Sequence, residues 1–279
     1  MNDFDPVTQD PLTNDPKFPA TILPASFISG GDKVLGTMLI ASGEGPHPTV
    51  LLLNGFPGNE VNYDIAHMMQ RQGFNVFTFY YRGSWGSKGE FSWSNLIEDS
   101  TTALEFLRSI YCREKFMVDG SRIVFVGYSM GGFSVLFNSI CFDQIKNVAA
   151  IAPFNPGLFG HVLETNSGIK IYAVQELQPA MDFVNSCSAE GLLEDMIKHK
   201  SDWNLLNYAE KLSKKNLLII SAQDDLTAPV QLHHHPLVNA LRTFNGNLQD
   251  FILETGHSFS NKRIQLMKII SEWLNQIKF

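Results

Sequence analysis

Short apolar runs alternate with helical stretches along most of this chain. Residues 49–54 (TVLLLN) form one continuous apolar run, a pattern that predicts a strand buried on both faces. Further strand-like runs lie at 74–80, 122–128, 148–152, 216–221 and 248–254. Helices are predicted between and after them at 60–72, 96–110, 130–141, 230–244 and 263–277. This alternation predicts an α/β fold, in which a mainly parallel, doubly wound sheet is covered by helices on both faces.

The alternation is absent at the N-terminus and interrupted once later. Residues 1–24 hold five prolines, several Asp and Asn residues and no sustained periodicity. We therefore expect an N-terminal arm that lies on the surface or is partly disordered. The main domain is predicted at 25–279, and it opens with a β-hairpin of strands 25–29 and 34–41. Residues 154–212 contain helix-like segments without a strand-like run, so we predict a helical cap inserted into the same domain.

Composition and charge exclude some classes of protein. The chain has 279 residues, of which 44% are hydrophobic, and its formal net charge is −7. Nucleic-acid-binding proteins usually present a basic face, so this acidic balance predicts no nucleic-acid partner. The three cysteines form no C-x-x-C pair and favour a reducing compartment. The first residues lack a signal-peptide pattern, and no run approaches the ~20 apolar residues that span a bilayer. We therefore expect a cytoplasmic protein with no membrane partner.

A candidate nucleophile lies between a predicted strand and a predicted helix. Residues 127–131 read G-Y-S-M-G, and G-x-S-x-G in this context forms a sharp turn that projects the serine Oγ out of the sheet. The glycines avoid collisions with the neighbouring strand and helix. The helix that follows points its N-terminal N–H groups and the positive end of its dipole at the site. Ser129 is the predicted nucleophile, and the backbone N–H of Met130 is placed to stabilise an oxyanion.

Histidine and carboxylate partners for this serine are found later in the chain. An imidazole can take the hydroxyl proton at neutral pH, and of the eight histidines His257 lies just after a predicted strand and before the last helix. An orienting carboxylate is expected after the strand that follows the cap, where Asp224 and Asp225 compete. The adjacent residues His233–His235 would diverge by about 100° per residue on a helix, so three cannot face one ion. We expect a solvated helix start there and no metal site.

Together these motifs carry a family resemblance. The order Ser…Asp…His matches that of α/β-hydrolases. Residues 81–89 (YRGSWGSKG) resemble the R-G-x-G-x-S-x-G loop of the prolyl-oligopeptidase-like and acylaminoacyl-peptidase-like branch, with Trp85 and an altered spacing, and 118–123 (VDGSRI) resemble its strand entry before the nucleophile. The chain thus resembles serine hydrolases of the α/β-hydrolase superfamily, in that branch or among the related dienelactone-hydrolase-like esterases. The resemblance covers about residues 25–279 and is specific for fold and triad, not for substrate.

The resemblance implies which carboxylate completes the triad. The family pattern reads G-x-x-D with a proline four residues later. Ala222 stands in place of the glycine and Pro229 four residues after Asp225. This register favours Asp225, whereas alignment of Ser221 with the glycine would select Asp224.

It also implies a second oxyanion donor and a pocket residue. α/β-hydrolases typically carry a His-Gly pair after the strand at 49–54, and the next residue donates its backbone N–H to the oxyanion. Here Asn54 replaces the histidine, and Phe56 is the implied donor. Trp85 lies in a loop predicted near the site and is a candidate substrate-binding residue. The resemblance implies no metal and no organic cofactor.

These residues favour a carboxylesterase that acts on a small acyl ester through an acyl-enzyme intermediate, with Ser129, Asp225 and His257 as the triad. An acylaminoacyl-peptidase-like or aminopeptidase-like enzyme would use the same triad on a short peptide. A third hypothesis is a non-catalytic binding protein on a hydrolase fold. The sequence leaves the oligomeric state open.

Overall fold

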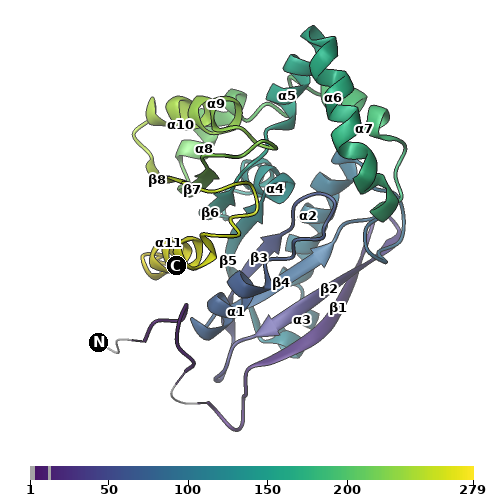
Figure 1. Cartoon of the computed structure of the whole chain (residues 1–279). Helices are drawn as coiled ribbons and strands as arrows, with labels where there is room; N and C mark the ends of the chain where they lie inside the picture. The colour runs from purple at the N-terminus through teal and green to yellow at the C-terminus, as the bar shows by residue number, and fades with distance from the viewer. Residues whose placement is uncertain (1–3, 12–13) are drawn as a thin grey trace.

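An eight-stranded sheet forms the centre of the computed structural model, which describes residues 4–11 and 14–279 (Figure 1). In spatial order the strands are β1-β2-β4-β3-β5-β6-β7-β8. The pairs β1–β2 and β2–β4 are antiparallel, and every other neighbouring pair is parallel. The predicted mainly parallel α/β architecture is confirmed. The strands are β1 (Thr21–Ser29), β2 (Asp32–Ile40), β3 (His47–Leu53), β4 (Asn75–Tyr80), β5 (Val118–Tyr128), β6 (Asn147–Ile151), β7 (Asn216–Ala222) and β8 (Asn247–Leu253).

Helices cover both faces of this sheet. Helices α1 (Tyr63–Arg71) and α11 (Arg263–Asn275) pack on one face, where their apolar side chains join one buried cluster. A second cluster on the opposite face is covered by α2 (Trp93–Arg108), α3 (Ile110–Phe116), α4 (Met130–Ser139), α8 (Ala209–Ser213) and α10 (His235–Arg242). The doubly wound arrangement expected from the alternating pattern is therefore present.

Burial on both faces explains why the central strands read as continuous apolar runs. In β5, Ile123 and Phe125 belong to one cluster, while Val124 and Val126 belong to the other. Successive side chains of a strand point to opposite faces, so each of these residues enters an apolar layer. Each fully buried aliphatic or aromatic side chain of this size contributes ~1.5–3 kcal/mol of hydrophobic stabilisation.

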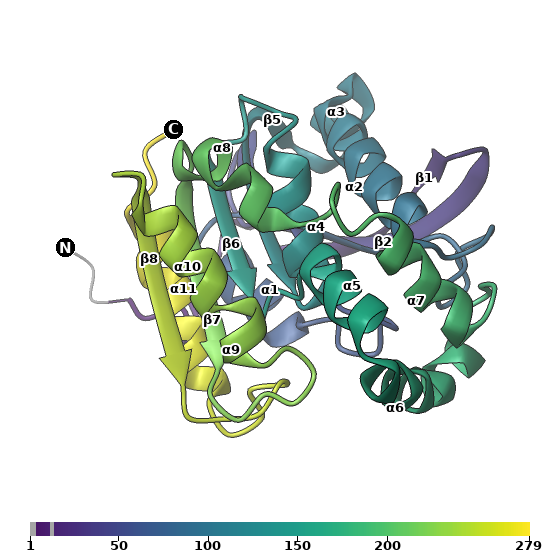
Figure 2. The same cartoon turned by 90° about the horizontal axis from the view of Figure 1, so that it is seen from above.

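The segment between β6 and β7 is helical. Helices α5 (Pro156–Thr165), α6 (Ser167–Leu177) and α7 (Ala189–Lys198) contact one another and project together from the sheet (Figures 1 and 2). Two 3₁₀ turns, Gln178–Phe183 and Leu205–Tyr208, lie in the same segment. Helix α8, at its end, packs against α10 and β7 instead of joining the projecting helices. We call α5–α7 with the first 3₁₀ turn, residues 156–198, the insertion.

Some predicted boundaries were wrong. Strand β1 begins at Thr21, so residues 21–24 of the expected arm belong to the hairpin; Pro24 is compatible with this because β1 is an edge strand. Residues 1–3 and 12–13 of the arm lie outside the described residues. The helix expected at 230–244 is two helices, α9 (Val230–His233) and α10, because Pro236 favours the first turn of a new helix.

Across the described ranges 4–11 and 14–279, no helix is both long enough and apolar enough to span a bilayer.

Candidate active site

Ser129 occupies a strained turn between β5 and α4. Its φ of 56° and ψ of −115° are rare for a residue with a side chain, and such strain is typical of functional positions. Neighbouring glycines make the turn possible: a Cβ on Gly127 would collide with the carbonyl of Gly131, and a Cβ on Gly131 would collide with the carbonyl of Leu53. The turn therefore needs both glycines where the sequence has them.

The structure brings Ser129, His257 and Asp225 together in one hydrogen-bonded row. The Nε2 atom of His257 lies 3.0 Å from the Oγ of Ser129, and its Nδ1 atom lies 2.6 Å from Oδ2 of Asp225. A carboxylate only accepts hydrogen bonds, so Nδ1 carries the proton and Nε2 is left as the acceptor for the serine hydroxyl. This is the arrangement in which an imidazole can take a proton from serine.

Asp225 is the buried member of the two candidate carboxylates. Its side chain has no exposed surface, and its Oδ1 also accepts the N–H groups of Thr227 and Ala228 at 2.8 and 2.7 Å. These two bonds fix the carboxylate beneath the imidazole. Asp224 is exposed and lies outside the row.

Tyr128 holds the histidine loop against the nucleophile strand. Its hydroxyl donates to the carbonyl of His257 at 3.2 Å, and the two rings lie 5.1 Å apart. The imidazole is thus constrained from the carboxylate side and from the strand side.

The loop after β3, which carries Phe56, presses against the nucleophile turn. A Cβ on Gly55 would lie 3.0 Å from the Cβ of Ser129, so a larger residue would push the loop away. Asn54 secures the start of the loop: its Nδ2 donates to the carbonyl of Phe79 at 3.1 Å, and its Oδ1 accepts from Thr78 at 3.4 Å. Met130 is the first residue of α4, at the positive end of the helix dipole.

Trp85 connects the β3 loop to the insertion. Its indole N–H donates to the carbonyl of Pro57 at 2.8 Å, and its ring stacks on Phe183 of the insertion at 5.4 Å. It is 41% exposed and has a φ of 46°, so an aromatic face is presented to solvent from a strained backbone. Its role in substrate binding stays a prediction.

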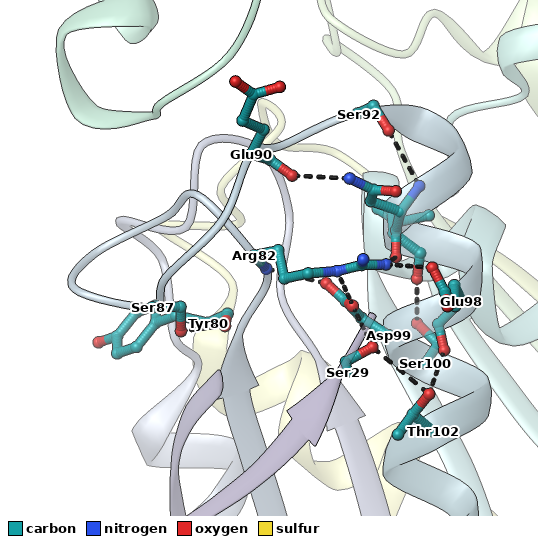
Figure 3. Close-up of polar contacts among 12 residues, drawn as sticks. Ser29, Tyr80, Arg82, Ser87, Glu90, Ser92, Glu98, Asp99, Ser100 and Thr102 are labelled. Atoms are coloured by element: carbon teal, nitrogen blue, oxygen red, sulfur yellow. Dashed lines mark hydrogen bonds and ion pairs between the residues drawn. The ribbon is translucent and has the colours of Figure 1, made fainter. Parts of the chain in front are cut away.

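A buried ion pair anchors the loop that carries Trp85. The backbone N–H and the Nε of Arg82 donate to the two oxygens of Asp99 on α2, at 2.8 and 2.6 Å, and Nη2 pairs with Glu98 (Figure 3). Ser29 also donates to Asp99 at 2.6 Å. Figure 3 shows these groups converging between β1, the loop and α2. Arg82 thus holds its loop against α2 and β1.

Backbone hydrogen bonds also join this loop to the insertion. Asn185 donates its N–H to the carbonyl of Gly83 and accepts from the N–H of Phe91, both at 2.7 Å. Its side-chain Nδ2 donates to the carbonyl of Gly89 at 2.8 Å, and Ser84 and Val184 form an isolated β-bridge. Residues 83–91 are therefore one of the links between the sheet and the insertion.

The three adjacent histidines do not form a solvated helix start, contrary to expectation. His233 and His234 are buried and have different partners: Nδ1 of His233 accepts the N–H of Asn155 at 2.9 Å, and Nδ1 of His234 lies 2.9 Å from the Oγ of Ser221. The spacing of Val230, His233 and Leu237, at i, i+3 and i+7, is the available sequence signal that His233 faces the core. In the part of the chain that the structure describes, no three His, Cys, Asp or Glu residues are placed to hold a metal ion.

Comparisons with known proteins identify a family. The family model described as acetyl xylan esterase (AXE1) matches residues 62–243. Among curated relatives, the uncharacterized protein YfhR of Escherichia coli (strain K12) is 32% identical over 89 residues, which are 32% of this chain and 30% of that protein. YfhR of Salmonella typhimurium matches equally over 29% of its length. The chain thus aligns with about a third of these relatives.

Solved structures show the same fold at low sequence identity. A putative dipeptidyl aminopeptidase IV from Bacteroides ovatus has a TM-score of 0.69 at 18% identity, covering 93% of this chain and 36% of that one. An acylaminoacyl peptidase of Pyrococcus horikoshii has a TM-score of 0.68 at 17% identity, covering 92% and 41%. The α/β hydrolase GrgF from Penicillium sp. sh18 has a TM-score of 0.64 at 18% identity, covering 93% and 100%. The chain has the α/β-hydrolase fold.

Proposed function

The chain belongs to the acetyl xylan esterase (AXE1) family and is a hydrolase, and we propose that it cleaves carboxylic esters with Ser129 as nucleophile, His257 as base and Asp225 as orienting carboxylate. One observation carries the proposal. The three side chains form a hydrogen-bonded row that ends on a serine held in a strained turn at a strand end. We propose that its substrate is a small molecule with a short acyl group.

In the proposed reaction, the Oγ of Ser129 attacks the acyl carbon while Nε2 of His257 takes its proton. The resulting imidazolium is stabilised by Asp225 and returns the proton to the leaving alcohol oxygen. Water, deprotonated by the same imidazole, then hydrolyses the acyl-enzyme. The backbone N–H groups of Phe56 and Met130 would stabilise the oxyanion in both steps, each by ~3 kcal/mol.

Esters rank ahead of peptides for a chemical reason. An alcohol leaves more readily than an amine, and a peptidase that acts on chain ends also needs a charged group to hold the terminus. The likeness to peptidases is below 20% identity and supports the fold alone. The name of the matched family refers to an acetyl ester of a polysaccharide, which makes acetyl esters the first substrates to test.

The test combines turnover with labelling of the serine. The purified protein is assayed with p-nitrophenyl acetate, acetylated xylan and an aminoacyl-p-nitroanilide, and it is labelled with a fluorophosphonate probe. We expect ester turnover well above anilide turnover, and a label on Ser129 that Ser129→Ala abolishes. Ser260→Ala, at an exposed serine, is the matched control and should be labelled like the wild type. Anilide turnover equal to ester turnover would favour the peptidase, and folded protein without label on Ser129 would exclude the mechanism.

A further inference from the structure

His233, the last residue of α9, is buried against the residues at the start of the insertion. Only 3% of its surface is exposed. Its ring lies 4.6 Å from the ring of Phe154 and 6.3 Å from that of Phe159. Its Nδ1 atom accepts the backbone N–H of Asn155, the residue that caps α5. The imidazole is therefore held in one orientation by an aromatic contact and a hydrogen bond.

This hydrogen bond fixes which nitrogen of His233 carries the proton. Because Nδ1 accepts, the proton of the neutral ring is on Nε2. Burial lowers the pKa of His233 to about 3, so the ring is neutral at pH 7. Within the described residues, Nε2 is buried and has no hydrogen-bond partner. An unpaired buried donor destabilises a protein by ~1–3 kcal/mol, so this N–H calls for a partner that those residues do not supply.

His233 contacts the nucleophile turn through Phe154. Its pKa also responds to the charges of Asp225 and His257, after the larger effect of burial. Phe154, on which the ring of His233 packs, donates its backbone N–H to the carbonyl of Ser129 at 3.2 Å. A single residue, Phe154, therefore contacts both His233 and Ser129.

A second unpaired donor is close to the same aromatic ring. Trp93 is buried, and its Nε1–H has no partner in the described part of the chain. Its ring stacks on Phe154 at 6.3 Å. Two buried N–H donors without partners therefore lie next to one phenyl ring.

We propose that the Nε2–H of His233 binds substrate by donating a hydrogen bond to an oxygen of the ester other than the two oxygens of the scissile group. This inference rests on the proposed esterase function and makes it narrower. The enzyme then prefers esters that carry an ether or hydroxyl oxygen near the scissile bond over alkyl esters of the same shape, because the alkyl ester leaves the donor unpaired.

The test compares matched esters in which one CH₂ is replaced by oxygen. For the acyl side, the pair is p-nitrophenyl methoxyacetate and p-nitrophenyl butanoate. For the alcohol side, it is 2-methoxyethyl acetate and butyl acetate. The quantity measured is the ratio of kcat/KM for the oxygen-containing ester to that for the alkyl ester. Any intrinsic difference in reactivity within a pair cancels when this ratio is compared between two forms of the protein.

His233→Asn is the diagnostic variant. Its amide oxygen can take the place of Nδ1 and accept the N–H of Asn155, while nothing remains at the position of Nε2. We expect the ratio to fall about tenfold for one of the two pairs, and that pair identifies the side on which the oxygen is bound. His235→Asn, at the exposed neighbouring histidine, should leave the ratio as in the wild type.

His233→Gln keeps the inference testable if the first variant does not fold. Its amide nitrogen can approach the position of Nε2, so its ratio should lie closer to that of the wild type. The proposal is wrong if Asn lowers both members of each pair equally, if Asn changes neither, or if Gln is as low as Asn. A wild-type protein that hydrolyses none of these esters refutes the proposed function instead, and so the two failures are distinguishable.

Discussion

The sheet side and the insertion side of this site are built in different ways. Ser129 and Asp225 follow β5 and β7, whose carboxyl-terminal halves are buried, and they are 6% and 4% exposed. In α6 of the insertion only Ala173 is buried, while Ile171 and Tyr172 are 62% and 57% exposed. The proposed reacting groups are therefore fixed by the packing of the whole core. The insertion joins that core through buried residues of α5 and α7, such as Leu163 and Leu193, while α6 lies mostly at the surface.

This difference predicts which property a substitution changes: the catalytic rate and the stability of the fold, or the binding of substrate. A change on the sheet side should alter the rate for every substrate or the stability of the whole fold, because the core is cooperative. A change at the insertion contacts should alter which substrate binds. Substitutions on the two sides test whether the effects divide in this way.

Asp225→Asn should lower kcat for ester hydrolysis about 10⁴-fold. An amide in this position favours the wrong imidazole tautomer and cannot stabilise the imidazolium, while the shape of the side chain is kept. The measurement is steady-state kinetics with p-nitrophenyl acetate, together with a melting curve to show that the variant is folded. Asp224→Asn, at the exposed neighbour, is the control and should keep wild-type rates. Equal losses in both variants would contradict the assignment of Asp225.

Asp99→Asn should destabilise the protein by ~3–5 kcal/mol, because it leaves the buried guanidinium of Arg82 without its main partner. Urea denaturation followed by tryptophan fluorescence measures the change in the free energy of unfolding. The comparison is Glu194→Gln, which breaks an exposed ion pair with Lys170 in the insertion. Solvent screens that pair, so the expected loss is below ~1 kcal/mol. Similar losses at both sites would remove the contrast between the two regions.

The sequence predicts the sheet side well, and the reason is physical. A strand buried on both faces is apolar along its centre, as 50–53 is, and a G-x-S-x-G turn requires its glycines because a Cβ there would collide with neighbouring backbone. Ser129 and His257 could therefore be predicted from local patterns and chain order, whereas the choice of Asp225 over Asp224 rested on the family resemblance. Their approach within hydrogen-bond distance depends on the parallel sheet, which brings the carboxyl ends of β5, β7 and β8 to one edge.

The sequence was less informative about the residues whose positions depend on tertiary contacts. The burial of His233 also depends on the hydrogen bond from Asn155, 78 positions earlier in the chain, and the residues around His233 do not encode this contact. In the same way, the link between Asn185 and residues 83–91 joins segments about a hundred positions apart. Such contacts involve single polar residues in irregular segments, which carry no periodic signal.

The free energy of unfolding should decrease at acid pH because His233 is buried in its neutral form. Its folded-state pKa of about 3 lies below its ordinary value of 6.5, so between these values the unfolded chain binds a proton that the folded protein does not. Stability from this group is therefore complete above pH 6.5 and decreases as the pH falls, by ~2 kcal/mol between pH 6.5 and pH 5. Urea denaturation at pH 7 and pH 5 should show a decrease in the wild type that is larger by about this amount than in His233→Asn. An equal decrease in both proteins would mean that His233 is already protonated in the folded state.

Trp85→Phe should produce the smallest effect and the most selective one. Phenylalanine keeps an aromatic ring to stack on Phe183 and has the same backbone cost at positive φ, but it lacks the N–H that bonds Pro57. Loss of one partly exposed hydrogen bond corresponds to about 1 kcal/mol, so KM should rise roughly fivefold while kcat stays within about twofold. Phe183→Leu, which removes the insertion's half of the stack, should raise KM in the same direction. If Trp85→Phe lowers kcat and leaves KM unchanged, the indole positions the oxyanion loop of Phe56 and does not bind substrate, and Trp85 then belongs functionally to the sheet side.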